Sequence, residues 1–359
     1  MANHRVATLL ASKSNTTPGT ETVDVDVRAP ISRISIHNKV TSAGTVLTAH
    51  PAANISKIEL IDGSNILASL SGYQCQALNF YNQKKTPNCF LTDISAVQTW
   101  QTFDLDFGRW LFDTLYALDP TRYDNLQLKI THNYQTADAS ASASTLEVYA
   151  HAFDKKKITP IGFLRAREHK AYTCGADGTT EYVELPIDQT IRQILVRASA
   201  NDYYPWQVAN RLKLSENSDA VVPMDISTSA FLKHINREYP RVEEPAAIAV
   251  NQTARDVYTM AVWQLHFGLM PVTVTNIIAM EAVNKSLPVA LDITASDNCT
   301  GIISGCQPHA CFPIPFGDQE DPNDWYDLAG VDKLNLQVKA GSAGTNGSVS
   351  VVLEQLQRY

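Results

Sequence analysis

The sequence predicts an all-β protein built from two tandem antiparallel β-sandwiches, with short helices in loops. Two observations support this fold class: apolar residues alternate with polar ones in many short segments, and blocks from the first half recur in order in the second half. Successive side chains of a strand point to opposite faces, so alternation is typical of strands with one buried face and one solvent face. Long helical segments between strands, which would indicate a parallel sheet, are absent from the sequence.

The alternating segments are short, and residues that favour turns, such as Gly, Pro, Asn, Asp and Ser, lie between them. In the clearest example, Val23, Val25 and Val27 alternate with polar neighbours. Many short strands separated by turns are typical of a sandwich or barrel. Segments with this pattern include residues 31–36, 58–60, 103–107, 126–131 and 146–150.

The second half of the chain repeats the first in five ordered blocks. Residues 21–38 match 181–198 at an offset of 160, and residues 57–82 match 211–236 at an offset of 154 without a gap. One such match could arise by chance, because strands share hydrophobic patterns, but an ordered set indicates duplication of one sandwich. Each block keeps its alternation and therefore predicts the same buried face twice. The other blocks pair 103–108 with 312–317, 124–130 with 332–338, and 145–150 with 348–353.

The duplication also predicts the domain limits. Residues 1–19 form a polar N-terminal arm, disordered or extended in the free subunit, and residues 20–158 form the first sandwich. Residues 159–359 form the second sandwich, which carries an insertion around 240–307, because the offset rises by 55 between Asn236 and Phe312. Long insertions are tolerated at loop tips. We therefore expect part of 240–307 to project from an outer surface.

Within the insertion, residues 258–280 are apolar with alternation at Val272, Val274 and Ile277, which predicts ordered β-structure. The remainder, about 281–307, ends in a segment rich in Ser, Asp, Asn and Cys.

One short helix is expected in each sandwich, within GYQCQALNFYN and ISTSAFLKHINREY. In the second, Phe231, Ile235 and Tyr239 recur every four residues and predict one apolar stripe facing the core.

Composition excludes several classes of protein. The net charge of −8 argues against a chain that coats nucleic acid, because neutralising phosphates needs a basic face, and Lys155–Lys157 is the only basic run. No window approaches the ~20 apolar residues of a spanning helix, and the apolar run before Lys13 is too short for a secretory signal. Six cysteines without a CxxC pair are too sparse for a disulfide scaffold, which favours assembly in a reducing cytoplasm.

Two tandem sandwiches of about eight strands, each with a short helix and a closing segment rich in F-G and L-x-L, resemble the double jelly-roll major capsid proteins. FDLDFG with DNLQLKI and FPIPFG with DKLNLQV carry the resemblance, which covers residues 20 to 359. This family forms the shells of tailless, often membrane-containing, icosahedral viruses, bacteriophages among them. The resemblance implies two tandem eight-stranded antiparallel jelly-roll sandwiches.

The resemblance further implies a structural subunit of the virion and not an enzyme. It implies homotrimers of pseudo-hexagonal outline that tile an icosahedral capsid assembled in the host cytoplasm. Expected partners are further copies of the chain in neighbouring capsomers, minor capsid or penton proteins and an underlying membrane, without direct sequence-specific binding of nucleic acid. No catalytic, cofactor-binding or metal residues are assigned.

Two clusters could hold a metal ion, although simpler interpretations are preferred. Cys299, Cys306, His309 and Cys311 contain zinc-ligand types, but their spacings of six and four intervening residues match no common motif, so incidental thiols are the preferred interpretation. The stretch from Asp318 to Asp327 could offer oxygen ligands to calcium but lacks a calcium-loop spacing, so a solvated turn is preferred. Its acidic residues are Asp318, Glu320, Asp321, Asp324 and Asp327.

Two alternative functions remain open from the sequence. In a carbohydrate-binding, lectin-like sandwich, Tyr203, Tyr204 and Trp206 would stack on sugars, although aromatics in such a loop equally suit a subunit contact. In a sandwich-fold hydrolase, two carboxylates would face one another across a cleft. The catalytic motifs GxSxG, Walker A, GxGxxG and HExxH are absent from the sequence, and no HxH or HxxxH pair supports a metal-binding cupin.

Overall fold

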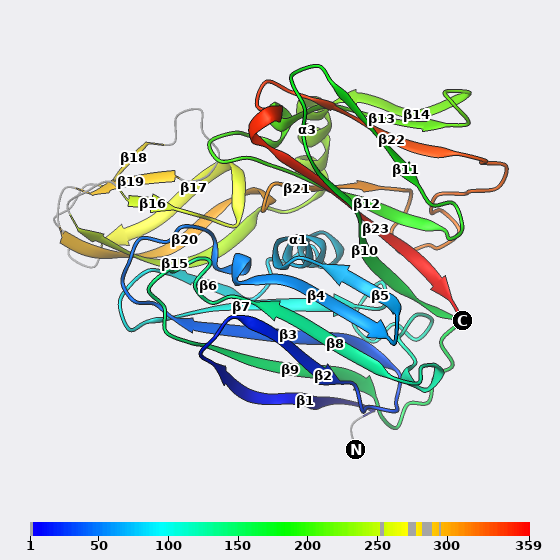
Figure 1. Ribbon diagram of the computed structural model, residues 1–359, viewed down its shortest axis with the longest axis horizontal. Coiled ribbons are helices and arrows are strands. Elements are labelled where there is room, and N and C mark those ends of the chain that lie inside the picture. The colour runs from blue at the N-terminus through cyan, green and yellow to red at the C-terminus, as the bar shows by residue number, and fades with distance from the viewer. Residues whose placement is uncertain (1–2, 252–254, 272–277, 282–288, 294–295) are drawn as a thin grey trace.

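The computed structural model shows two β-sandwiches lying against one another, with a group of strands extending to one side (Figure 1). It describes residues 3–251, 255–271, 278–281, 289–293 and 296–359. No helix in these ranges is both long and apolar enough to cross a membrane.

The first sandwich pairs the sheet β1-β9-β3-β7-β6 with the sheet β2-β8-β4-β5. A 12-residue helix, α1 (Gly72–Gln83), follows β5. The strands are β1 (His4–Asn15), β2 (Gly19–Asp24), β3 (Ile31–Thr41), β4 (Ile55–Asp62), β5 (Asn65–Leu70), β6 (Cys89–Thr92), β7 (Gln98–Asp106), β8 (Leu126–His132) and β9 (Ser144–Phe153).

The second sandwich repeats this plan with the sheets β10-β23-β12-β21 and β11-β22-β13-β14. Its helices are the short α2 (Pro205–Val208) and α3 (Thr228–Glu238), the counterpart of α1. The strands are β10 (Gly162–Thr173), β11 (Thr180–Leu185), β12 (Ile191–Ser199), β13 (Ala209–Glu216), β14 (Val221–Ser227), β21 (Cys311–Pro315), β22 (Leu334–Ala340) and β23 (Ser348–Arg358).

Strand register confirms the duplication residue by residue. In β3, Ile36 lies between Phe103 and Val148 of its two neighbouring strands. In β12, its counterpart Val196 lies between Phe312 and Val351, which are the residues that the offsets of 209 and 203 predict. The two halves therefore share their pairing as well as their hydrophobic pattern.

The ungapped match across residues 57–82 is wrong after its first strand. Strands β4 and β13 begin at Ile55 and Ala209, which are 154 apart, but Ser71 and Ser227, which precede α1 and α3, are 156 apart. The β4–β5 turn has two residues between its last pair, and the β13–β14 turn has four. Two extra polar residues in a turn do not change the hydrophobic pattern of the strands beside it. The pattern therefore could not reveal the longer β13–β14 turn, and the match was drawn without a gap.

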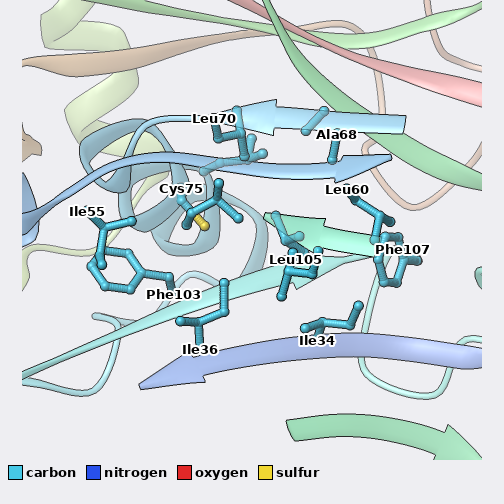
Figure 2. Close-up of a cluster of buried hydrophobic side chains, with 14 of the residues drawn as sticks. Ile34, Ile36, Ile55, Leu60, Ala68, Leu70, Cys75, Phe103, Leu105 and Phe107 are labelled. Atoms are coloured by element: carbon cyan, nitrogen blue, oxygen red, sulfur yellow. The ribbon is translucent and has the colours of Figure 1, made fainter. Parts of the chain in front are cut away.

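Each sandwich has its own core, formed by the inward face of both sheets. Figure 2 shows the first core, where Ile34 and Ile36 of β3 face Leu60 of β4 across the interior, with Phe103 and Phe107 beside them. All five are at most 2% exposed, and burying each stabilises the fold by about 1.5–3 kcal/mol. The second core contains their counterparts Ile194, Val196, Leu214 and Phe312 among others.

Both expected helices are present, and α3 presents the predicted stripe. Ile235 is buried, Phe231 packs against both cores, and Tyr239 contacts the ring of Tyr81 at 4.9 Å between centroids.

Residues 4–15 of the predicted N-terminal arm adopt the extended alternative. They form β1, which pairs antiparallel with β9 along most of its length, from His4 opposite Phe153 to Asn15 opposite Ser144. The arm is thus an edge strand of the first sandwich.

The insertion of the second sandwich extends a sheet of the first. Strand β15 (Val242–Asn251) pairs in parallel with β6, and β20 (Ser296–Pro308) lies between β15 and β17 (Ala261–Pro271). The short strands β16 (Arg255–Val257), β18 (Ile278–Glu281) and β19 (Val289–Ile293) form a small sheet that projects from the body (Figure 1).

Strands β17 and β18 confirm the ordered β-structure expected for residues 258–280 where these are described, whereas Val272, Val274 and Ile277 lie outside the described residues. Residues 296–308, at the end of the insertion, lie within the extended sheet. This polar-looking segment is a 13-residue strand, because Cys299 and Ile303 bury one of its faces against β15 and β17.

Candidate functional site

The two sandwiches meet along one sheet of the second sandwich. The sheet β10-β23-β12-β21 is buried on both faces: Ile194 and Val196 of β12 belong to the second core, and Leu195 between them belongs to the first. Helix α1 lies between the sandwiches and covers this second face (Figure 1). Strands β5 and β10 pair in parallel at Ser69 and Arg167, so one sheet runs through both sandwiches.

A capping box fixes the start of α1 at the junction. The Ser71 hydroxyl accepts the Gln74 N–H, and the Gln74 side-chain oxygen accepts the Ser71 N–H at 2.8 Å. The amide nitrogen of Gln74 then donates to Ser350 of β23 at 2.8 Å and to Glu168 of β10. The residue that caps the helix therefore also binds it to the second sandwich.

A buried polar network fixes the other end of α1. Arg192 Nη1 and Glu354 Oε2 form a 2.9 Å ion pair whose side chains are 3% and 2% exposed. Asn82 at the end of α1 donates to Glu354 Oε1 at 2.8 Å, and Gln193 donates to Glu354 Oε2 at 2.7 Å. Arg192 compensates the buried charge of Glu354, and Asn82 satisfies the second carboxylate oxygen, so the position of α1 completes the network.

Among the described residues no helix covers the equivalent face of the first sandwich, although the ring of Phe112 packs there against His4, His151 and Phe153. Arg33, the counterpart of Gln193, pairs with Asp106 at 2.5 Å and with Asp104 at 3.5 Å. Further along β3, the side chains of His37 and Lys39 are 37% exposed. This polar, half-exposed face is the geometric counterpart of the face that α1 covers in the second sandwich.

The counterpart of α1 is likewise uncovered, because α3 exposes one side. That side carries Lys233, His234, Arg237 and Glu238. The neighbouring strand β14 is a sheet edge, and its Val221 and Val222 are 51% and 41% exposed. Helix α3 and strand β14, the counterparts of α1 and β5, are therefore both exposed.

The four residues considered as zinc ligands do not converge. His309 Nε2 faces Gln76 Oε1 at 2.9 Å, Cys306 Sγ lies 3.5 Å from Gln264 Oε1, and Cys311 Sγ lies 3.7 Å from the His309 carbonyl. Cys299 is buried on the inner face of β20. Among the described residues, no three His, Cys, Asp or Glu side chains are placed to share a metal ion.

The acidic stretch forms turns in which carboxylates accept backbone N–H groups. Asp318 accepts from Glu320, Asp321 from Asn323, and Asp327 from Ala329. The Asp324 carboxylate accepts the Asp318 N–H at 2.5 Å, and the Asp318 carbonyl accepts the Trp325 indole N–H at 3.1 Å. The acidic residues therefore stabilise the turns of this loop.

The aromatic residues of the proposed sugar platform pack into the protein. Tyr204 stacks on Trp206 at 4.5 Å, and Trp206 meets Trp263 edge-on at 4.8 Å. Tyr203 and Trp206 pack against the second core. The indole of Trp206 is thus in contact with two other rings.

Asp104 and Asp106, two neighbouring carboxylates on β7, do not flank a cleft. Burial raises the pKa of Asp106, and Arg33 opposes this shift. The space beside them is about 10 Å³, which is too small for any sugar. A hydrolase site of two opposed carboxylates is not formed here.

Comparison with known proteins resolves the fold. No protein-family model matches the sequence, and no curated protein matches it. The major capsid protein of Sulfolobus Turreted Icosahedral Virus superposes with a TM-score of 0.63 at 12% identity, covering 99% of this chain and 97% of that protein. The chain has the double jelly-roll fold.

Two further double jelly-roll structures agree. The major capsid protein of bacteriophage PM2 has a TM-score of 0.55 at 11% identity, covering 99% of this chain and 98% of that protein. The PBCV-1 virus capsid protein has a TM-score of 0.56 at 11% identity, covering 99% of this chain and 94% of that protein.

Sequence reasoning missed the double-sided burial in the second jelly roll. One signal was available: the counterparts of Ser35 and Tyr149 are Leu195 and Val352, so polar alternation is lost where the first roll docks. Loss of alternation is typical of strands that are buried on both faces.

Proposed function

We propose that the chain is a major capsid protein, a structural subunit that forms pseudo-hexagonal homotrimers tiling an icosahedral virus shell. The observation that carries this proposal is the pair of jelly rolls with equivalent registers, lying side by side in one chain. Three copies supply six similar units, which can form a near-hexagonal ring. The likeness to double jelly-roll capsid proteins supports a structural role in the virion and not an enzymatic one.

In this proposal residues 20–158 and 159–359 are the two rolls, and residues 1–19 are an N-terminal arm that adds strand β1 to the edge of the first roll. The partners are neighbouring capsomers, minor capsid or penton proteins and an underlying membrane, in a particle assembled in the host cytoplasm. The net charge of −8 supports the absence of direct sequence-specific binding to nucleic acid.

The junction inside the chain supplies a template for the contact between copies. Within one chain, α1 and the edge of β5 dock on the sheet that contains β10, β23 and β12. Their counterparts α3 and β14 would dock on β1, β9 and β3 of the next copy. The parallel pair Ser69 and Arg167 then corresponds to Asp225 of one copy and Ala7 of the next.

The residues at the end of each helix show what this docking would bring together. Asn82, which binds Glu354 and lies beside Gln193, corresponds to Glu238 on the exposed side of α3. The counterparts of Gln193 and Glu354 are Arg33 and His151. The repeated docking would therefore place Glu238 of one copy near Arg33, which also pairs with Asp104 and Asp106 of its own chain, and near the ring of His151.

The test uses the oligomer mass, because the proposed interface makes α3 essential for the trimer. Ala230 corresponds to Gln74, which touches β10 and β23 across the internal junction. Light scattering during gel filtration should give three times the 39.5 kDa chain mass for the natural protein. Ala230→Arg should shift the mass to that of the monomer, because its side chain enters the docking face.

Ala176→Arg, the same change at an exposed alanine in the loop before β11, is the control and should leave the trimer intact. A natural protein that stays monomeric at high concentration contradicts the capsomer proposal. A trimer that survives Ala230→Arg contradicts the docking of α3 while leaving the capsomer in place.

A further inference from the structure

A cavity of about 500 Å³ lies at one end of the junction, where both jelly rolls and the insertion meet. Thr48 to His50 of the first roll and Tyr73 of α1 form one part of its wall. Arg197, Tyr203 and neighbouring residues of the second roll form another, and Tyr258 and Val262 of the insertion complete it. A cavity of this size accommodates a small organic molecule.

Arg197 is held rigidly at the cavity wall. Its Nε donates to the His309 carbonyl at 3.1 Å, and its guanidinium carbon lies 4.7 Å from the centre of the Tyr73 ring. Within the described ranges, Arg197 forms no ion pair, and its two Nη atoms make no hydrogen bond. A fixed guanidinium with both terminal nitrogens available is suited to bidentate binding of a carboxylate or phosphate.

The other ionisable groups of the wall do not offset this charge. None of the described residues that line the cavity is an aspartate or a glutamate. Burial, and after it the neighbouring His50 and Arg197, lowers the pKa of His309 well below its usual range, so this ring is neutral. His50 has both ring nitrogens engaged, one by the Ala52 N–H at 3.0 Å and the other by Glu244 at 2.7 Å.

We infer that this cavity binds a small organic anion, whose carboxylate or phosphate pairs with Arg197 while its planar body lies against Tyr203 and Tyr258. The pairing supplies the counter-charge that the fold does not give to Arg197, and the tyrosines supply flat, partly apolar contact area. Binding at this place is independent of the proposed capsid role. It joins the two rolls and the insertion through one ligand.

Isothermal titration calorimetry of the full chain at low salt, with benzoate, adenosine monophosphate and inorganic phosphate as probes, tests the inference. The natural protein should bind at least one aromatic anion saturably. Arg197→Gln should weaken that binding about tenfold or more, because a charge-assisted bidentate contact is lost. Arg211→Gln, which removes an exposed arginine paired with Asp225 on β14, is the matched control and should leave affinity unchanged.

Tyr258→Ala tests the contact with the planar body of the ligand separately from the contact with its charge. It should weaken the binding of benzoate and adenosine monophosphate and leave the binding of phosphate unchanged. The inference is overturned if no probe binds up to about 10 mM, the weak limit of specific recognition, or if Arg197→Gln binds as the natural protein does. Circular dichroism checks the fold of each variant. Should Arg197→Gln unfold, unchanged binding of both aromatic anions by Tyr258→Ala overturns the inference instead.

Discussion

At the scale of single residues, the junction depends on polar groups that burial holds in one protonation state. Gln76 donates its amide N–H to Gln101 at 2.8 Å, so its oxygen accepts from Nε2 of His309. That ring is neutral in the folded protein because its pKa is lowered by burial. Sequence reasoning noticed His309 as a candidate zinc ligand. It could not place the ring against α1, because that contact joins residues 233 positions apart.

Because His309 is neutral in the folded protein, we predict that the protein becomes less stable as the pH falls. Unfolded histidine takes up a proton near pH 6.5, whereas folded His309 does so only at lower pH, so the unfolded state binds more protons as the pH falls. The free energy of unfolding should therefore fall below about pH 6.5, by at most about 1.4 kcal/mol per pH unit for this residue. Denaturant unfolding at several pH values measures the slope.

His309→Gln keeps an amide donor for Gln76 and removes the titrating group, so its slope should be shallower than that of the natural protein. His132 and His151, whose pKa values burial also lowers, remain and account for a residual slope. Identical slopes for the two proteins would contradict the assignment.

At the scale of elements, alternation located the strands well but not their partners or their turns. The pattern in β3 and β8 gave the correct inward residues, and the stripe on α3 gave its buried side. The length of the β13–β14 turn was missed, since turn residues carry no periodic signal. Strand β20 was not predicted, because its glycines and polar residues mask the burial of Cys299 and Ile303.

Strand β20 offers a matched pair of neighbouring isoleucines. Ile303 is 1% exposed in the small core between β15 and β17, whereas Ile302 on the opposite face is 49% exposed. Ile303→Ser should lower the free energy of unfolding by about 3 kcal/mol, because it opens a cavity and buries a hydroxyl. Ile302→Ser should change it by less than about 0.5 kcal/mol. Thermal denaturation of the two variants makes the comparison, and equal effects would show that β20 is not a core strand.

At the scale of the whole molecule, the sequence predicted two rolls but did not predict that their sheets join. The duplication was readable because both copies conserve register, as Val196 and Ile36 show. Two parallel contacts, β5 with β10 and β6 with β15, join strands that are distant in sequence. Hydrophobic pattern contains no information on which edges meet, so the merging of the sheets became visible only in the structure.

Because residues of the second half complete the core of the first, we predict that neither half folds well alone. Residues 159–359 without the first roll would expose Phe163, Leu195 and Val352, which all belong to the first core. Expressed separately, the halves 1–158 and 159–359 should be largely insoluble, because an exposed apolar face of this kind promotes association. Co-expressed, they should form a soluble one-to-one complex. Gel filtration of the three preparations distinguishes this from two independent domains, for which each half would be soluble and monomeric.

The two parallel contacts also have a mechanical consequence. Two pairs of strands join the rolls, and α1 lies between these pairs. The rolls therefore resist both bending and torsion about the single linker at residues 154–161. Such a chain behaves as one stiff plate and not as two hinged ones. When many plates cover a curved surface under internal pressure, all the change in angle occurs at the seams between plates, so the seams set both the radius of curvature and the load at which the surface yields.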